Sequence, residues 1–239
     1  MSHTHPEQID RLSLDCVILG LEAGQLNILL IQRGIEPHRG EWALPGGFVL
    51  LEEGIDEASR RILREMTGVD NLFLEQVRAF GAVDRYPGRR VITLVYYALV
   101  RPGNYQLIAG PEALEARWFS SRHLPPLPFD HNVIVQETLA LLQYKVRHQP
   151  VGFELLPEKF TLFQLQELYE AILGQRLDKP NFRRKLMRMN LLVQLDEYQQ
   201  EVAHRAARLY RFDKDRYDDL CREGFVFEVG YPKGVKPLR

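Results

Sequence analysis

The segment from Gly46 to Val69 constrains the fold of this 239-residue chain more than any other stretch. It begins with two glycines and a short apolar run, continues with an acidic loop, and ends in a helical pattern. Apolar side chains recur there at three- and four-residue spacing, as expected of a helix with one buried face; they are Ile55, Ala58, Ile62, Leu63 and Met66. Gly68 suits the left-handed residue that often follows a helix. The segment therefore predicts a strand, a loop and an amphipathic helix.

The spacing within this segment resembles the Nudix box, a strand–loop–helix cassette with which many diphosphate hydrolases hold Mg²⁺. The positions that match are Gly47, Glu53, Arg61, Glu65 and Gly68. Where the family carries three helix glutamates, this chain has Ile62, Glu65 and Met66. Mg²⁺ needs oxygen ligands in near-octahedral geometry, and isoleucine and methionine offer none. The resemblance therefore implies a Nudix scaffold with a dismantled metal site, and we predict no catalytic residue and no metal ligand.

The segments around the box fit an α/β sandwich with a helix on each side of mixed strands. Apolar runs predict strands at residues 12–20, 26–32, 72–83, 91–100 and 114–119, of which 72–83 and 91–100 form a long hairpin. A second helix is predicted from His131 to about Val146, with Val133, Leu139, Leu142 and Val146 on its buried side.

A ligand site is predicted where these strands end. In the Nudix proteins that the pattern resembles, the arginine at the position of Arg33 often faces the phosphates of the substrate, and guanidinium donors match phosphate oxygens. The hairpin tip, residues 84–90, is basic, and similar tips in ADP-ribose-handling Nudix proteins project toward the ligand. A solvent-exposed strand end and a solvated tip are the alternatives. The predicted ligand-binding residues are Arg33, Trp42, Glu53, Arg61, Glu65 and Arg85.

Composition excludes several classes of protein. The net charge of −1 provides no global attraction to nucleic acid, and no run approaches the ~18 apolar residues of a membrane span. Residues 1–11 are polar and lack the apolar core of a signal peptide. The two cysteines, Cys16 and Cys221, lie far apart in the sequence, as is usual in a reducing compartment. We therefore expect a cytoplasmic protein with no membrane segment.

The positive charge is concentrated in the second half of the chain. Residues 1–150 contain 15 basic and 18 acidic residues, whereas residues 179–211 contain 8 basic and 3 acidic ones. Upstream of that segment, Thr161 and Gln164 form a capping box that predicts a helix ending at Gly174. A short turn then precedes a second helix, residues 180–189, whose side chains divide into an apolar face and a basic one. This is the arrangement of a helix-turn-helix, whose second helix enters the major groove of DNA.

Two predicted strands, residues 191–195 and 208–212, follow these helices and flank a polar loop, as in a winged helix. An ordinary helical domain with a solvated basic face is the alternative. The predicted DNA-binding residues are Lys179, Asn181, Arg183, Arg184, Lys185, Arg188, Arg205 and Arg208.

Taken as a whole, the chain resembles the Nudix-related transcriptional regulators, or NrtR-like proteins, over about residues 12–213. The resemblance implies an α+β chain: a Nudix α/β/α sandwich in residues 1–148, a linker in 149–159, and a winged helix-turn-helix with a C-terminal tail in 160–239. It implies a homodimer, expected to act as a repressor, that binds double-stranded operator DNA and senses a small molecule. ADP-ribose is the first choice of effector and a pentose sugar the second. One departure lies in the wing, where His204-Arg205-Ala206-Ala207 replaces Gly-Arg-Pro-Ala.

Two functions from different classes follow. The first is a ligand-sensing transcription factor, which requires no cofactor. The second is a Nudix hydrolase with an appended domain, because Glu52, Glu53 and Glu65 leave a weak Mg²⁺ site open. The loss of oxygen ligands at Ile62 and Met66 favours the first, since the hydrolase needs a metal to stabilise charge on the phosphates. A partner-binding module without activity is a third possibility, and the basic helix counts against it.

Overall fold

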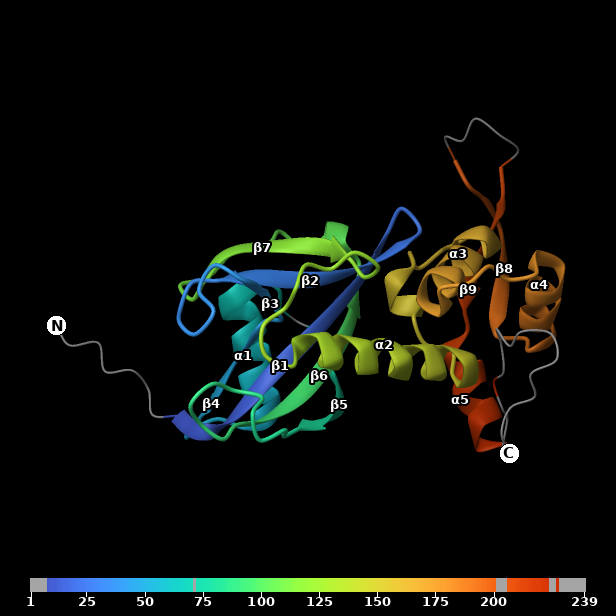
Figure 1. The fold of residues 1–239 in the computed structure, drawn as a ribbon. Helices are drawn as coiled ribbons and strands as arrows, with labels where there is room; N and C mark the ends of the chain where they lie inside the picture. Colours follow the sequence, from blue (N-terminus) through green and yellow to red (C-terminus); the bar gives the residue numbers. More distant parts are fainter. Residues whose placement is uncertain (1–7, 71, 201–205, 224–226, 228–239) are drawn as a thin grey trace. The chain divides into compact units, whose positions relative to one another are not determined.

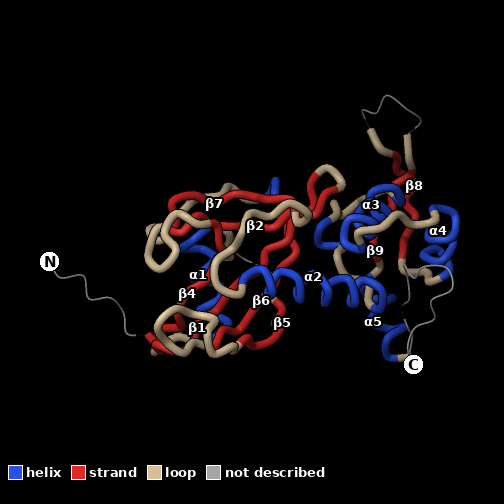
Figure 2. The backbone as a smooth tube through the Cα atoms, in the orientation of Figure 1, coloured by secondary structure: helices blue, strands red, loops and turns tan. Residues whose placement is uncertain are grey.

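The structure is a computed structural model and describes residues 8–70, 72–200, 206–223 and 227 (Figure 1). The chain divides into two units, residues 1–139 and residues 140–239. Figure 2 shows that strands dominate the first unit, whereas helices account for most of the second. The helix α2, His131–His148, begins in the first unit and ends in the second.

A mixed seven-stranded sheet forms the first unit. Its strands are β1 (Gln8–Glu22), β2 (Gln25–Arg33), β3 (Trp42–Ala43), β4 (Gly46–Leu50), β5 (Glu75–Phe80), β6 (Ile92–Val100) and β7 (Ala113–Ser120). They are ordered β3-β2-β1-β6-β5, with β4 also paired to β1 and β7 to β2. Only β1 and β6 run parallel among these pairs, and the predicted hairpin is the antiparallel pair β5–β6. The predicted strands are confirmed with small shifts at their ends.

Two helices cover opposite faces of this sheet, because side chains alternate along β1. Leu14, Cys16 and Ile18 point to the face on which α1, Ile55–Thr67, contributes its buried side chains. Asp15, between them, points the other way and faces His131 at the start of α2. In Figure 1, α2 crosses in front of β1 and β6. The predicted α/β/α sandwich is therefore confirmed.

The buried faces of these helices differ from the predicted ones at three positions. Ile55 is 38% exposed because it is the first residue of α1, where side chains tilt back beyond the end of the helix. Val133 is 47% exposed and Leu139 is only partly buried, whereas Leu142 and Val146 are buried as predicted. The other buried residues of this side of α2 are Ile134, Val135 and Thr138. Apolar residues occur on both sides of α2, so the spacing of apolar residues alone could not identify which side of the helix is buried. Gly68 follows α1 with a φ of 73°, in the left-handed region, as predicted.

The second unit contains the predicted helices and strands. They are α3 (Leu162–Leu173), α4 (Lys179–Arg188), β8 (Leu192–Tyr198), β9 (Arg208–Phe212) and α5 (Lys214–Arg222). β8 and β9 are antiparallel, and Phe160 exchanges two backbone hydrogen bonds with Tyr210 of β9. Two helices followed by this pair of strands form the predicted winged helix.

Local side-chain chemistry fixes the start of the winged helix. The Thr161 hydroxyl accepts a hydrogen bond from the Gln164 N–H, and the Gln164 side chain accepts one from the Thr161 N–H. The predicted linker, residues 149–159, contains a 3-10 turn at Phe153–Leu155. Phe153 stacks on Phe212 of β9, with ring centroids 4.2 Å apart. This part of the predicted linker therefore packs within the second unit.

Candidate functional site

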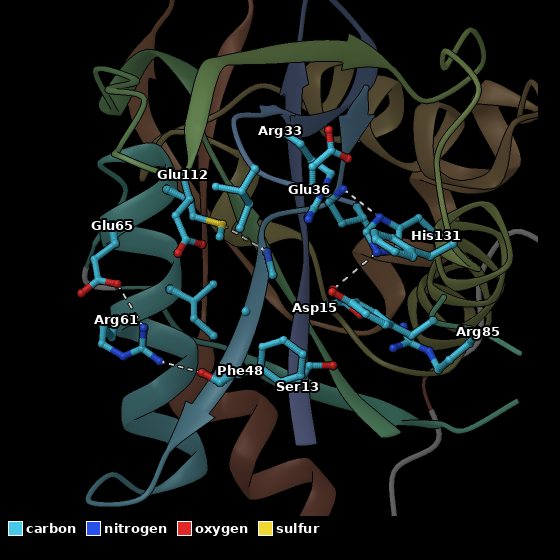
Figure 3. Close-up of a pocket in the computed structure, with 18 of the residues that line it drawn as sticks. Ser13, Asp15, Arg33, Glu36, Phe48, Arg61, Glu65, Arg85, Glu112 and His131 are labelled. Atoms are coloured by element: carbon cyan, nitrogen blue, oxygen red, sulfur yellow. Dashed lines mark hydrogen bonds and ion pairs between the residues drawn. The ribbon is translucent and has the colours of Figure 1, made fainter. Parts of the chain in front are cut away.

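A cavity of about 510 Å³ opens in the first unit beside the two glycines of β4 (Figure 3). This volume is in the range that small-molecule sites occupy. Figure 3 shows Arg61 and Glu65 on one side of the cavity, and Asp15, Arg85 and His131 on the other. The residues that line it are Ser13, Asp15, Arg33, Ile35, Glu36, Leu44, Gly46, Gly47, Phe48, Arg61, Ile62, Glu65, Met66, Arg85, Tyr86, Arg89, Pro111, Glu112, Phe129 and His131.

The half of the box that matches the Nudix pattern is an ion-pair clamp centred on Arg61. Its Nε and Nη2 atoms donate to the Glu53 carboxylate at 2.8 and 2.6 Å, and its Nη1 donates to Glu65 at 3.0 Å. Nη2 also donates to the Phe48 carbonyl, which ties the loop to α1. The hydrogen bond from Arg61 holds the pKa of Glu53 below its usual range. These carboxylates are therefore engaged with protein rather than set apart for a cation.

The other half of the box does not fit Mg²⁺. Ile62 and Met66, at the positions of two family glutamates, are 1% and 7% exposed. The Met66 sulfur accepts a hydrogen bond from the Gly46 N–H at 3.4 Å, so a thioether occupies this position. Within the described residues, no group of three or more His, Cys, Asp or Glu side chains could hold a metal ion. The donor set here is apolar and sulfur-containing, the opposite of what a hard cation prefers.

A buried ion-pair network forms the opposite wall. The Arg85 guanidinium donates to Asp130 at 2.8 and 2.9 Å and to Asp15 at 3.1 Å, and its side chain is 3% exposed. His131 lies 3.5 Å from Asp15, and its Nδ1 accepts a hydrogen bond from the Leu44 N–H. Burial by itself raises the pKa of Asp15, but His131 and Arg85 outweigh that effect and leave this pKa below its usual range. This wall therefore holds a charged, mutually compensated cluster.

The network depends on a glycine. Gly46 lies opposite Asp15 in the β1–β4 pairing. A Cβ atom at Gly46 would overlap the Asp15 carboxylate and would come within 2.8 Å of the Leu14 carbonyl. Only a residue without a side chain permits β4 to approach Asp15 so closely. The packing against this wall therefore explains why position 46 is a glycine.

Aromatic rings line the cavity between these walls. Tyr86 stacks on Phe129 with ring centroids 5.3 Å apart and an interplanar angle of 8°. The Arg33 guanidinium lies 5.2 Å from the Phe129 ring centroid, and Arg89 lies 4.5 Å from that of Phe48. Phe129 has a φ of 57°, which non-glycine residues rarely adopt. Such outliers cluster at ligand sites, so the backbone conformation at Phe129 is a further sign of a binding site.

The structure brings four of the six predicted ligand residues to the cavity: Arg33, Arg61, Glu65 and Arg85. Trp42 is not among its described lining residues and instead packs edge-on against Phe119. Glu53 reaches the site only through Arg61. Of the two alternatives for the hairpin tip, the structure favours the one that faces the cavity, because Arg85, Tyr86 and Arg89 line it. Arg85 is only 6% exposed, since it is paired with Asp15 and Asp130.

Sequence reasoning missed Asp15 and His131. Asp15 lies within a predicted strand and His131 begins a predicted helix, but their pairing joins residues more than a hundred positions apart. A buried aspartate within an otherwise apolar strand is the one signal that could have indicated them, because such a group requires a partner.

The second candidate site is the exposed face of α4. Asn181, Arg184, Lys185 and Arg188 follow the i, i+3, i+4, i+7 spacing of one helix face. Phe182 and Leu186, on the other side, are buried against the unit. Asp178 caps the helix by accepting a hydrogen bond from the Asn181 N–H. In the part of the chain that the structure describes, no carboxylate forms an ion pair with these basic side chains, so their charge is available to an external anion.

The remaining predicted DNA-binding residues lie around this face. Lys179 is exposed at the first turn of α4. Arg183 is half-buried beside the face rather than on it, and its Nε atom has no hydrogen-bond partner among the described residues. On the wing, Arg208 lies over the Tyr198 ring and donates to the Tyr198 hydroxyl. Arg205 lies outside the described residues.

No helix in the described part of the chain is long and apolar enough to cross a membrane.

Comparison with known proteins now defines the class. Residues 11–141 match the NUDIX domain, and residues 152–212 match the NrtR DNA-binding winged helix domain. A curated relative, the ADPR responsive transcriptional repressor NtrR of Acinetobacter baylyi, is 38% identical over 211 residues, covering 87% of this chain and 84% of the relative. A shorter match is the ADP-ribose pyrophosphatase of Methanocaldococcus jannaschii, 39% identical over 46% of this chain and 64% of the relative.

Solved structures agree with this class. Shewanella oneidensis NrtR complexed with a 27mer DNA has a TM-score of 0.72 at 27% identity. The match covers 90% of this chain and 97% of the Shewanella chain. The NUDIX domain of the same protein complexed with ADP ribose has a TM-score of 0.52 at 30% identity. The match covers 55% of this chain and 88% of that domain's chain. The chain belongs to the NrtR family of Nudix-related transcriptional regulators.

Proposed function

We propose that the protein is a transcriptional repressor that binds operator DNA through α4 and senses ADP-ribose in the cavity of its Nudix unit. The observation that carries the proposal is the exposed face of α4, whose basic side chains lack carboxylate partners among the described residues. Asn181 is close to the start of this helix, where recognition helices contact base edges. Arginine pairs with guanine and asparagine with adenine through two hydrogen bonds.

The relatives support both halves of the proposal. One is described as an ADPR responsive repressor, and related structures hold DNA in one case and ADP-ribose in another. The cavity is chemically suited to that effector. Its arginines can bind phosphate, its aromatic rings can stack on a base, and Glu36 and Glu112 can accept hydrogen bonds from sugar hydroxyls. A pentose sugar, the second choice of effector, would use only the last of these features.

The proposed complex is a homodimer on a partly palindromic duplex, with one α4 in the major groove at each half-site. The test is fluorescence anisotropy with a duplex from the promoter upstream of the protein's own operon, at two salt concentrations. We expect salt-dependent binding of two chains per duplex, and we expect ADP-ribose to change the affinity. An affinity that does not exceed that for a scrambled duplex would contradict the proposal.

A second function, weak Mg²⁺-dependent hydrolysis of ADP-ribose, is favoured only by the Nudix domain itself and by the pyrophosphatase relative. We propose that the protein lacks this activity, because Ile62 and Met66 are buried where the hydrolase carries carboxylates. Release of AMP from ADP-ribose in the presence of Mg²⁺ tests it directly. Turnover that disappears in Glu65→Gln would support the hydrolase instead.

A further inference from the structure

The four arginines that line the cavity differ in what already compensates their charge. Arg61 pairs with Glu53 and Glu65, and Arg85 pairs with Asp15 and Asp130. Arg33 and Arg89 form no ion pair with a carboxylate among the described residues. An arginine that is already bound to two carboxylates offers little net charge to a phosphate group. Arg33 and Arg89 are therefore the two cavity arginines that no described carboxylate binds directly, and of these Arg33 already donates to the Pro37 carbonyl at 2.8 Å.

The hairpin tip contains three arginines with three different roles. Arg85 is buried and ties the tip to Asp15 and Asp130. Arg90 donates to the carbonyls of Gly81 and Ala82 and so closes the turn. Arg89 is exposed and lines the cavity. Of the three, Arg89 is the one whose guanidinium meets the cavity without a carboxylate or carbonyl partner among the described residues.

Aromatic rings hold Arg89 at the cavity. Its guanidinium carbon lies 4.5 Å from the Phe48 ring centroid and 5.0 Å from that of Tyr86. A guanidinium on an aromatic face keeps all its N–H donors free at the edge. The side chain is thereby oriented before any ligand arrives, and this orientation reduces the entropy cost of binding.

We propose that Arg89, and not Arg85, is the residue of the hairpin tip that binds a phosphate group of the effector. Arg85 is a positioning residue, which fixes the tip so that Arg89 and Tyr86 face the cavity. This inference rests on the proposed sensing of ADP-ribose and deepens it by naming the tip residue that contacts the anionic part of that ligand.

The test is calorimetry of the full chain with two ligands, ADP-ribose and the uncharged adenosine. Arg89→Ala should weaken ADP-ribose binding at least about tenfold, because it removes a charge-assisted hydrogen bond to phosphate, and should change adenosine binding less than about twofold. Arg89→Lys should recover part of the affinity. Arg60→Ala is the matched control, since it removes the same charge from an exposed position of α1 outside the cavity, and it should change ADP-ribose affinity less than about threefold.

Thermal unfolding of the same variants separates binding from positioning. Arg89→Ala should unfold at the temperature of the wild type, whereas Arg85→Ala should unfold at a lower one. Wild-type affinity in Arg89→Ala, or equally weakened binding in Arg89→Ala and Arg60→Ala, would overturn the inference and leave the proposed function intact. A wild-type protein that binds no ADP-ribose would overturn both.

Discussion

The cavity of the Nudix unit and the exposed face of α4 are both rich in arginine, but they differ in how many of these arginines are bound to carboxylates. In the cavity, Arg61 and Arg85 each bind two carboxylates, and Arg85 is buried with its partners. On α4, Arg184 and Arg188 face solvent without a carboxylate partner among the described residues. Paired arginines organise the protein itself, whereas unpaired ones are available to an external anion. Charge compensation, rather than residue type, separates structural arginines from binding ones.

The largest effect is expected on the face of α4. Replacing Arg184, Lys185 and Arg188 together by alanine should weaken binding to the upstream duplex at least about a hundredfold, because each base-reading pair contributes ~1–3 kcal/mol. Each phosphate interaction that the variant removes should also reduce the salt dependence by about one unit of slope. Anisotropy titration at two salt concentrations measures both quantities.

The matched control removes the same charge from the Nudix unit. Arg39, Arg60 and Arg122 are exposed there, and their triple alanine variant should bind the duplex within about twofold of the wild type, because charges outside the interface are screened by salt. Equal weakening in the two triple variants would mean that α4 contributes only general positive charge.

The second largest effect is expected on stability, where a buried ion pair should contribute more than an exposed one. Arg85→Ala should destabilise the Nudix unit by ~3–5 kcal/mol, because it leaves Asp15 and Asp130 without their partner. Arg78 binds Glu137 in a similar two-bond geometry, but the side chains are 49% and 41% exposed, so Arg78→Ala should cost ~1 kcal/mol or less. Both tryptophans lie in the first unit, and their fluorescence during urea unfolding reports on that unit. A small effect of Arg85→Ala would contradict the structural role given to this arginine.

A third, smaller effect is the pH dependence of the same unit. The pKa of Asp15 is below its usual range in the folded chain, so the folded state releases this proton more readily than the unfolded one. The contribution of Asp15 to stability is therefore present above the unfolded pKa of ~3.9 and is lost as the pH falls through the folded pKa. Tryptophan fluorescence in urea between about pH 6 and pH 3 should show this decrease, and Asp15→Asn should flatten it. An unchanged pH profile in that variant would remove Asp15 from the explanation.

The smallest effect concerns the winged helix. Thr161→Ala removes the cap of α3 and should cost the second unit ~1 kcal/mol, whereas Thr161→Ser retains the hydroxyl and should cost less. Far-UV circular dichroism during unfolding measures the change, and the tryptophan signal of the first unit should stay the same. A shift in the tryptophan signal would show that the cap acts beyond its own unit.

The sequence predicted best what local chemistry decides. Thr161, Gln164 and Gly174 delimited α3, and the predicted strand 208–212 matches β9 residue for residue. The same holds for α1, where the Nudix spacing and the apolar stripe agreed. In these elements, the residues that determine the structure lie within a few positions of one another, so a single sequence contains the whole signal.

The candidate site was predicted less completely because its contacts join distant positions. Arg85 lies 70 residues from Asp15 and 45 from Asp130, and no local pattern distinguishes it from Arg89. The buried side of α2 was misplaced for a similar reason, since Val133 and Ile134 are equally apolar and only the sheet decides which one is covered. Spacing identified the elements, and tertiary contacts assigned the roles of their side chains.

The most direct test of the proposed function, a sensor without hydrolase activity, follows DNA binding and AMP release in one sample. The full chain is titrated onto the labelled upstream duplex with Mg²⁺, with and without ADP-ribose, while AMP is assayed in the same tubes. We expect ADP-ribose to change the affinity for DNA in the wild type, to have little effect in Arg89→Ala, and to remain unhydrolysed in both. Release of AMP at a rate that depends on Glu65, with a DNA affinity indifferent to ADP-ribose, would contradict this account.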